Sequence, residues 1–388
     1  MNTRFSRRTS WDLTESGFAA AIREARAAGC ELIDLTVSNP TVCGFEYDAE
    51  AILRPLGSVE GLTYDPDPRG MRSAREAVAE YYRDHRADVD PDEVVLTTST
   101  SEGYGYLFRL LCDANDEVLV AQPSYPLFDF LADLDDVRLK SYPLFYDQGW
   151  WIDFAELEKR IGPRTKAVVV VNPNNPTGHA TWMAERQRLE EICVRRGLAL
   201  IVDEVFLDYP LTERGLSSFA VKPHPVLTFC LSGMSKIAGL PQMKSAWIVG
   251  LGPEAERSQA MGRLEVIADT FLSMNAPVQG ALPRWLAERK GIQGQILKRV
   301  RENLGVAQGS GVEVLQVEGG WSAILRLPQM GEGDVAERLL QEMGVLVHPG
   351  SFYGIPESGR VVISLLGPEG ELRKGLELVV HGRKVEPR

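Results

Sequence analysis

The sequence lacks the long apolar run that a membrane-spanning helix requires. About 20 consecutive apolar residues are needed to cross a bilayer, and no stretch of comparable length occurs. The first residues include Arg4, Arg7 and Arg8 but not the apolar segment that characterises a secretory signal. We therefore expect no association with a membrane.

Cysteine and histidine are both scarce. The five cysteines are scattered and include no CxxC pair, which is typical of free thiols in a reducing compartment. A cytoplasmic location is therefore expected. The five histidines show neither HxxxH nor HxH spacing, so the sequence predicts no metal site.

Basic residues are fewer than acidic ones. The chain has 42 Lys and Arg against 54 Asp and Glu, a formal net charge of −12. Nucleic acids and anionic membranes are bound by basic surfaces, so neither is expected as a partner. Anionic small molecules remain compatible with this composition, because a few local Arg and Lys residues can bind them.

Helical and strand patterns alternate from about residue 70 onward in this 388-residue chain. The strand candidates are apolar runs without alternation, which is typical of strands buried on both faces of a parallel sheet. The expected helices are 72–85, 102–112 and 184–196, and the expected strands are 93–97, 117–121, 166–171, 199–203 and 226–231.

The last hundred residues change character and predict a smaller α+β domain. Helical patterns around 283–305 precede strand candidates at 312–317, 322–327, 345–348 and 361–366. A chain of this length usually forms more than one domain. We predict an N-terminal segment, 1–45, that packs with the small domain, a large domain at 46–284 and the small domain at 285–388.

Polar residues follow three successive strand candidates of the large domain. They are Asn175 in the turn NPNNPTG, Asp203, and Lys236 at the end of SGMSK. Taken singly, these residues are explained by a turn, a helix cap and a solvated charge. Ligands of parallel sheets bind at the carboxyl ends of the strands. The three residues in this order therefore indicate one common site.

With these motifs the chain resembles the fold-type I aminotransferases that use pyridoxal 5′-phosphate (PLP), in the aspartate aminotransferase class I/II superfamily. The matching motifs extend from about residue 33 to residue 366. The resemblance implies the α/β PLP-dependent transferase fold. In that fold a large domain with a mainly parallel, seven-stranded-type sheet flanked by helices is joined to a smaller α+β domain.

The resemblance implies PLP as cofactor and gives three residues catalytic roles. Lys236 matches the lysine that carries PLP as a Schiff base and then moves a proton between the substrate Cα and cofactor C4′. Asp203 matches the aspartate that keeps the pyridine nitrogen protonated. Asn175 matches the asparagine that hydrogen-bonds O3′ of the cofactor.

Further cofactor contacts follow from the same resemblance. Ser99, Thr100 and Ser101 lead into a predicted helix, whose N-terminus suits a phosphate dianion. Tyr125, in QPSYPLF, matches the aromatic residue that stacks on the cofactor ring, and Ser235 directly precedes the lysine.

Tyr64 and Arg360 match residues that reach a neighbouring subunit and the substrate. Tyr64, in YDPDPRG, matches a tyrosine that contacts the phosphate of the partner subunit, which implies a homodimer with shared active sites. Arg360, in SGRVVISLL, matches the arginine that binds the substrate α-carboxylate bidentately. Ser38 and Asn39 lie where relatives approach the substrate, although an Asn-Pro turn explains them equally well.

Three positions depart from the family pattern. Lys244 replaces an arginine and offers a point charge without the guanidinium fork. Phe206 replaces a tyrosine that bonds O3′, so the linkage at Lys236 is expected to titrate at higher pH. Gly233 replaces a serine, and the sequence leaves open whether the preceding Ser232 reaches the phosphate.

The resemblance implies transfer of an amino group between an L-amino acid and a 2-oxo acid, through a pyridoxamine intermediate. One alternative is a β-eliminating C–S lyase of the same fold, since fold and cofactor do not fix the reaction. A PLP-binding regulatory protein is a second alternative, which an N-terminus of only about 30 residues disfavours. Four aromatic residues are candidates either for the side-chain pocket or for ordinary packing, namely Trp11, Trp321, Phe352 and Tyr353.

Overall fold

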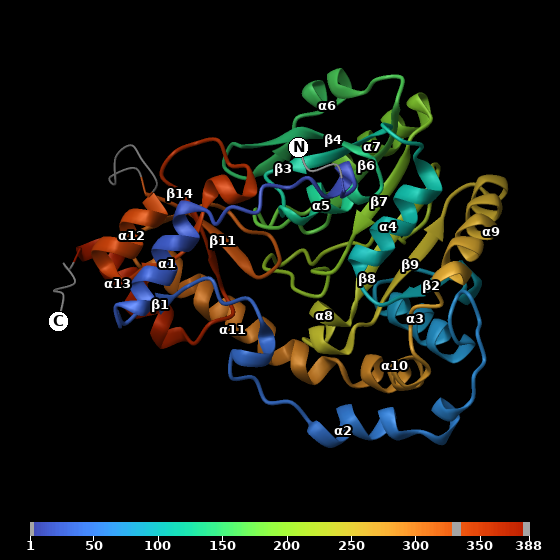
Figure 1. The fold of residues 1–388 in the computed structure, drawn as a ribbon, viewed down its shortest axis with the longest axis horizontal. Coiled ribbons are helices and arrows are strands. Elements are labelled where there is room, and N and C mark those ends of the chain that lie inside the picture. Colours follow the sequence, from blue (N-terminus) through green and yellow to red (C-terminus); the bar gives the residue numbers. More distant parts are fainter. Residues whose placement is uncertain (1–3, 328–334, 383–388) are drawn as a thin grey trace.

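The computed structural model describes residues 4–327 and 335–382, and it confirms the predicted α/β fold class. A central sheet runs through the larger part of the molecule, with helices on both of its faces (Figure 1). The sheet has eight strands, where a seven-stranded type was expected, in the order β2-β9-β8-β7-β6-β3-β4-β5. These strands are β2 (Val94–Thr97), β3 (Glu117–Gln122), β4 (Arg138–Tyr146), β5 (Trp150–Ile152), β6 (Thr165–Val171), β7 (Ala199–Asp203), β8 (Thr228–Gly233) and β9 (Ala246–Leu251).

The middle of this sheet is parallel and its edges are antiparallel. Strands β4, β3, β6, β7 and β8 pair in parallel, whereas β9 is antiparallel to both β8 and β2, and β5 is antiparallel to β4. All residues of β7 are buried. Successive side chains of a strand point to opposite faces, so Leu200 and Val202 enter one core while Ile201 enters another.

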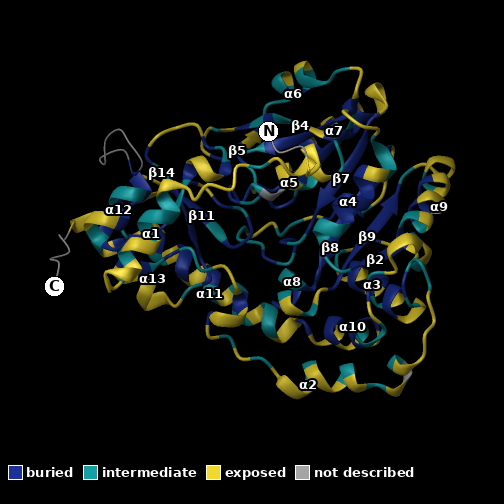
Figure 2. Ribbon diagram, in the orientation of Figure 1, coloured by how far each residue is buried: buried dark blue, intermediate teal, exposed yellow. Residues whose placement is uncertain are grey.

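Two helical layers cover the faces of the sheet, and the strands between them form the most buried part of the molecule (Figure 2). One core takes residues from α3 (Arg72–Asp84), α7 (Met183–Arg196) and α10 (Ala276–Glu288). The other takes residues from α4 (Thr100–Leu111), α5 (Leu127–Leu134) and α9 (Glu254–Phe271). No helix in the described ranges has the length and apolar character needed to cross a bilayer.

Helix α3 shows why the sequence folds in this way. Its buried residues include Ala74, Val78, Tyr81 and Tyr82, which recur every three or four positions. This spacing places them on one face of the helix, and that face packs against α10. The predicted helix at 72–85 is therefore confirmed to within one residue.

The smaller α+β unit is built on an antiparallel sheet of order β10-β11-β14-β13. Its strands are β10 (Glu313–Val314), β11 (Ser322–Arg326), β13 (His348–Pro349) and β14 (Arg360–Ser364). Its helices are α11 (Lys290–Gly309), α12 (Val335–Met343) and α13 (Glu369–His381). The N-terminal α1 (Gly17–Ala27) lies beside them, and α2 (Ala49–Leu53) lies under α10 (Figure 1).

The strand expected at 345–348 is divided between two sheets. β12 (Val345–Leu346) pairs in parallel with β1 (Ile33–Asp34), whereas β13 pairs with β14. The chain changes sheets at Val347, which a continuous apolar run does not reveal. The β1–β12 pairing joins the N-terminal segment to the small domain, and the predicted domain boundaries at residues 45 and 284 stay predictions.

Candidate active site

A cavity of about 560 Å³ lies at the carboxyl ends of β6, β7 and β8. Asn175, Asp203 and Lys236 all line it, so the structure brings the three strand-end residues together. Most of the other predicted site residues also line it, namely Ser38, Ser99, Thr100, Ser101, Tyr125, Phe206, Ser235 and Lys244. The structure does not bring Ser232, Asn39, Tyr64 or Arg360 to this cavity.

Lys236 lies in the short helix α8 (Met234–Ile237), which directly follows β8. Its Nζ lies 5.1 Å from the ring centre of Trp321 and 5.7 Å from that of Phe206. Burial lowers the pKa of the ammonium group, and the nearby Asp203 carboxylate offsets part of this effect. A lysine with a lowered pKa is more readily present as the free amine, the form that attacks a carbonyl carbon.

Asp203 ends β7 and is 8% exposed. Its carboxylate accepts hydrogen bonds from the Tyr104 hydroxyl at 3.2 Å and from the Val205 N–H at 3.1 Å. Burial raises the pKa of Asp203 to about 6, and the two hydrogen bonds and Lys236 act in the opposite direction. A cation bound beside this carboxylate would favour its ionised form.

Tyr104 is a site residue that the sequence did not reveal. It lies in α4, is buried, and lines the cavity as well as bonding Asp203. Its position one turn into the helix that follows TTSTS was the available signal. A buried tyrosine in an amphipathic helix is most often a core residue, so sequence alone gave no reason to single it out.

The loop after β6 presents Asn175 because its neighbours are held elsewhere. Asn174 donates hydrogen bonds to the Pro123 carbonyl at 3.1 Å and to Thr177 Oγ1 at 2.9 Å. The Ser322 hydroxyl, at the start of β11, donates to Asn175 Oδ1 at 3.4 Å. Gly178 closes the loop with φ of +68°, where a Cβ would lie 2.8 Å from the Gly319 carbonyl oxygen.

The N-terminus of α4 forms one end of the cavity. Ser99 caps the helix, with its Oγ accepting from the Glu102 N–H at 3.1 Å, and Thr100 and Ser101 form the first turn. Lys244 lines the same cavity after the short helix η6 (Pro241–Met243). Free N–H groups at a helix start and a lysine together suit a phosphate dianion. Ser232 is instead fully buried, with its Oγ 3.5 Å from the Glu204 carbonyl oxygen.

Arg360 lies at the first position of β14, and its guanidinium contacts Glu357 and Trp150. Its Nη1 is 3.2 Å from the Glu357 carboxylate, and the group lies 5.9 Å from the ring centre of Trp150. Val362, two residues further along the same strand, lines the cavity. Asn39 also turns inward to its own loop, where its Oδ1 accepts from the Thr41 N–H and hydroxyl.

The cavity is also lined by polar and apolar residues that the sequence did not single out, among them Thr36, Ser322, His348, Val362 and Ser364. Of the four aromatic candidates, Trp321, Phe352 and Tyr353 line the cavity. Trp11 lies elsewhere, with its Nε1 donating to Asp133 at 2.8 Å.

A buried cluster of ionisable side chains lies next to the loop that contains Asn175. His179 is 2% exposed, with Nε2 3.1 Å from Glu185 and Nδ1 3.6 Å from Glu318. Burial lowers the pKa of the imidazole, but the carboxylates of Glu185 and Glu318 outweigh this and raise it to about 9. Glu318 also accepts from the Ala180 N–H at 2.9 Å and from Trp182 Nε1 at 2.8 Å. The cluster therefore links the loop after β6 to the segment that leads into β11.

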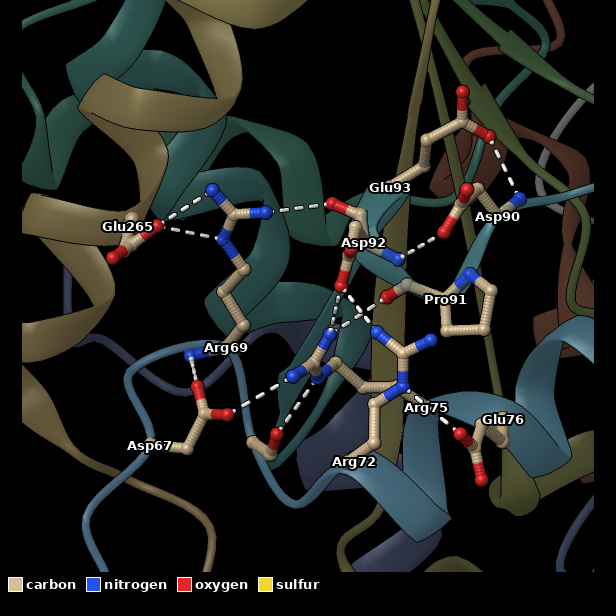
Figure 3. Close-up of polar contacts among 11 residues, drawn as sticks. Asp67, Arg69, Arg72, Arg75, Glu76, Asp90, Pro91, Asp92, Glu93 and Glu265 are labelled. Carbon is tan, nitrogen blue, oxygen red and sulfur yellow. Dashed lines mark hydrogen bonds and ion pairs between the residues drawn. The ribbon is translucent and has the colours of Figure 1, made fainter.

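Tyr64 belongs to a surface segment that is held by ion pairs. Arg75, 6% exposed, bonds Asp67 at 2.9 Å and the Gly70 carbonyl at 2.8 Å, and Arg69 Nε bonds Glu265 at 2.7 Å. Figure 3 shows these arginines between the segment and the acidic residues around 90–93. Tyr64 itself is 81% exposed.

The residues present fit PLP. The cavity holds an amine of lowered pKa, a buried carboxylate that a cation would neutralise, and a helix N-terminus beside a lysine. Its volume falls in the range of roughly 300–1,000 Å³ that ligand sites occupy. When bound, PLP supplies an aldehyde that takes the substrate nitrogen and a pyridine ring that withdraws electrons from the substrate Cα.

Comparison with known proteins agrees with this chemistry. The family model for aminotransferase class I and II matches residues 30–378. The alanine aminotransferase of Mycobacterium tuberculosis is 27% identical over 368 residues, which cover 90% of this chain and 85% of the relative. A glutamate-pyruvate aminotransferase of Haemophilus influenzae is 28% identical over 274 residues, covering 69% of this chain and 67% of the relative.

The comparison with solved structures shows the same fold. The solved alanine aminotransferase of Pyrococcus furiosus superimposes with a TM-score of 0.87 at 23% identity, covering 96% of this chain and 98% of that one. Since the family model spans nearly the whole described chain, the protein belongs to the aminotransferase class I and II family and is a PLP-dependent transaminase.

Proposed function

We propose that this transaminase moves the amino group of an L-amino acid to a 2-oxo acid, with PLP attached to Lys236. The observation that carries the proposal is the convergence of Lys236, Asp203 and Asn175 on one cavity. Among the relatives, the printed names include alanine, glutamate-pyruvate and tyrosine aminotransferase. Alanine is therefore the first donor to test.

Each of the three residues has a separate task in this proposal. Lys236 holds the cofactor and, once the substrate amine has replaced it, moves a proton away from the substrate Cα. Asp203 pairs with the pyridine nitrogen and keeps it protonated, because a buried carboxylate strongly favours a cationic partner. We assign Asn175 Nδ2 as the donor to O3′, and this assignment is supported by its Oδ1 accepting a hydrogen bond from Ser322.

The phosphate is assigned to the other end of the cavity. Ser99, Thr100, Ser101 and Ser235 supply hydroxyl and backbone donors, and Lys244 supplies the positive charge. Tyr125, 47% exposed at the cavity mouth, is assigned to the face of the cofactor ring. A tyrosine there gains contact area and loses exposure when the ring binds.

We also propose a homodimer in which Tyr64 completes the partner's site. Support comes from its 81% exposure and from the ion pairs that hold its segment in place. Exposed apolar side chains lie in the same part of the chain and at the C-terminal end of α9, namely Val59, Leu62, Phe271 and Leu272. The cytoplasmic location is proposed on the five cysteines, all of which are free thiols.

The test of the function is a spectral titration of the PLP-loaded protein with a panel of L-amino acids. Transamination predicts that a donor removes the visible band of the lysine-bound cofactor and that a 2-oxo acid restores it. The lyase alternative predicts pyruvate and ammonia from a cysteine-type substrate without any oxo-acid acceptor. The names of the relatives give that alternative no support.

A further inference from the structure

The main chain around Lys236 is held by two tyrosine hydroxyls that the proposed function does not use. Lys236 lies in α8, a helix of only four residues. The last carbonyl groups of a helix have no partners within it, and so short a helix has little stability of its own. The place of the Lys236 side chain therefore depends on the residues that hold this turn from outside.

Tyr209 holds the turn at the lysine itself. Its hydroxyl donates a hydrogen bond of 2.6 Å to the Lys236 carbonyl oxygen, and the residue is fully buried. The same carbonyl oxygen accepts from the Gly239 N–H at 3.2 Å. A carbonyl oxygen has two lone pairs, so the phenol and the N–H together satisfy it and fix the direction of the Lys236 carbonyl.

Tyr209 also contacts the aromatic side chain beside the lysine amine. Its ring meets that of Trp321 with 5.0 Å between the ring centres and an interplanar angle of 70°. Lys236 Nζ lies 5.1 Å from the centre of the same Trp321 ring. Edge-to-face contact is a favoured arrangement of aromatic pairs. One tyrosine therefore touches the main chain of Lys236 directly and the surroundings of its Nζ through Trp321.

The main chain holds Tyr209 in place on both sides. Its N–H donates to the Phe206 carbonyl at 3.0 Å, and its own carbonyl accepts from the Gly320 N–H at 3.0 Å. A Cβ at Gly319 would lie 2.6 Å from Pro173 Cγ and 3.1 Å from the Tyr209 carbonyl oxygen, so this close approach requires glycine. Tyr209 is not among the described residues that line the cavity. It can therefore affect the chemistry only through its neighbours.

A second tyrosine holds the end of the same turn. Tyr47 belongs to the N-terminal segment, and its hydroxyl donates at 2.8 Å to the Gly239 carbonyl oxygen. Gly239 has φ of +59°, and a Cβ there would lie 2.8 Å from the Tyr47 hydroxyl oxygen. Because Gly239 lies three residues after Lys236, the effect of Tyr47 on the lysine should be smaller than that of Tyr209.

We propose that Tyr209 and, more weakly, Tyr47 are positioning residues for Lys236, which hold the main chain of α8 and so keep Nζ in place within the cavity. The inference deepens the proposed function, on which it rests. When the cofactor is attached, the Lys236 nitrogen bonds to the aldehyde carbon of PLP and water leaves. A loosely held lysine loses more conformational freedom in this step. Loss of either hydroxyl should therefore weaken the linkage and leave the other cofactor contacts unchanged.

The experiment compares two ligands of the full chain after bound cofactor has been removed. PLP can form the linkage, whereas pyridoxamine 5′-phosphate carries an amine in place of the aldehyde and cannot. Calorimetry gives the dissociation constants of both ligands for wild type and for four variants, Tyr209→Phe, Tyr47→Phe, Tyr142→Phe and Lys236→Ala. Tyr142 is the matched control, because this buried tyrosine also donates to a main-chain carbonyl, that of Val169, at 2.9 Å.

The preference for PLP over pyridoxamine 5′-phosphate measures the linkage, and Lys236→Ala should remove it. We expect Tyr209→Phe to weaken PLP binding by about 2- to 10-fold, the loss of one neutral hydrogen bond, and to change pyridoxamine 5′-phosphate binding by less than about twofold. Tyr47→Phe should reduce the preference less than Tyr209→Phe but more than Tyr142→Phe. If Tyr209→Phe does not fold, Tyr47→Phe compared with Tyr142→Phe decides.

The inference is overturned if Tyr209→Phe keeps the wild-type preference for PLP, or if it weakens both ligands to the same extent, as a general loss of packing would. If Lys236→Ala has meanwhile lost the preference, that result contradicts this inference alone and leaves the attachment at Lys236 in place. A preference that survives in Lys236→Ala, or that is absent from the wild type, would contradict the proposed function and the inference together.

Discussion

The two walls of the cavity are built in different ways. The wall assigned to the cofactor comes from the ends of β6, β7 and β8, where Asn175, Asp203 and Lys236 leave a parallel sheet at one edge. The wall assigned to the substrate comes from β11, β13 and β14, where side chains along antiparallel strands face the cavity. In the first wall a residue's place follows from where its strand ends. In the second wall it follows from strand register.

This difference decides how each wall tolerates change. A strand end is fixed by the length of a buried run, so its polar residue stays at the edge even when the loop sequence varies. Along a strand, a shift of two residues keeps the face but moves the side chain by about 7 Å. Arg360 and Val362 illustrate the consequence, because one pairs with Glu357 and the other lines the cavity.

The largest expected effect is on the cofactor wall, at Asp203. Replacement by Asn removes the buried negative charge that keeps the pyridine nitrogen protonated. We expect kcat to fall on the order of 10²-fold or more, as for the loss of other fixed charges in active sites. Steady-state kinetics with the best amino donor measures this, and absorption confirms that PLP is still bound. A kcat within about fivefold of wild type would contradict the assignment of the Asp203 wall to the cofactor.

The next effect concerns the His179 cluster, which links the loop after β6 to the segment that leads into β11. Because the folded-state pKa of His179 is raised to about 9, its stabilising contribution is complete below the unfolded value and is lost as the pH rises through 9.

Denaturant unfolding of wild type and His179→Gln from pH 6 to 10 checks this expectation. The gap in unfolding free energy between the two proteins should narrow toward pH 10. The exposed His381 provides the control, since His381→Gln should show no such narrowing. A gap that is constant with pH would mean that His179 is neutral in the folded protein.

A smaller effect is expected from Phe206→Tyr. Phe206 lines the cavity beside Lys236 and has no hydroxyl to donate to O3′. A tyrosine there should stabilise the ionised oxygen and lower the pH at which the visible band of the lysine-bound cofactor titrates, on the order of one unit. A spectral pH titration measures the midpoint. An unchanged midpoint would show that position 206 does not reach O3′.

The smallest effect is expected from Tyr104→Phe. Losing the hydroxyl removes one of the hydrogen bonds that hold Asp203 and should raise the pKa of the carboxyl further. We expect kcat to fall by about 2- to 10-fold. Tyr106→Phe is the matched control, since that hydroxyl bonds Ser273 on another face of the same helix. Equal losses in both variants would assign the effect to helix packing.

Much of the cofactor wall could be predicted from the sequence. Strand limits followed from apolar runs, as at 199–203, which the structure confirms as β7. Because the strands are parallel, the polar residue at the carboxyl end of each run was expected at one common edge of the sheet. The sequence left open whether Ser232 contacts the phosphate, because this depends on the direction of its side chain. In the structure its Oγ lies near the Glu204 carbonyl oxygen.

The remaining features depend on contacts between distant elements. Tyr104 meets Asp203, and His179 meets Glu318, only after helices and loops have packed. The run at 345–348 divides between two sheets at Val347, and this division places His348 opposite Val362. No local pattern carries that information, so the substrate wall became visible only in the structure.

The most direct test of the account is chemical mapping of the PLP attachment. Borohydride reduction of the loaded protein, followed by proteolysis and mass spectrometry, should find the cofactor on the peptide containing Lys236. In Lys236→Ala the reducible linkage should be lost while the protein remains folded. Cofactor that stays reducibly attached in that variant, or that maps to Lys244 in the wild type, would contradict the account.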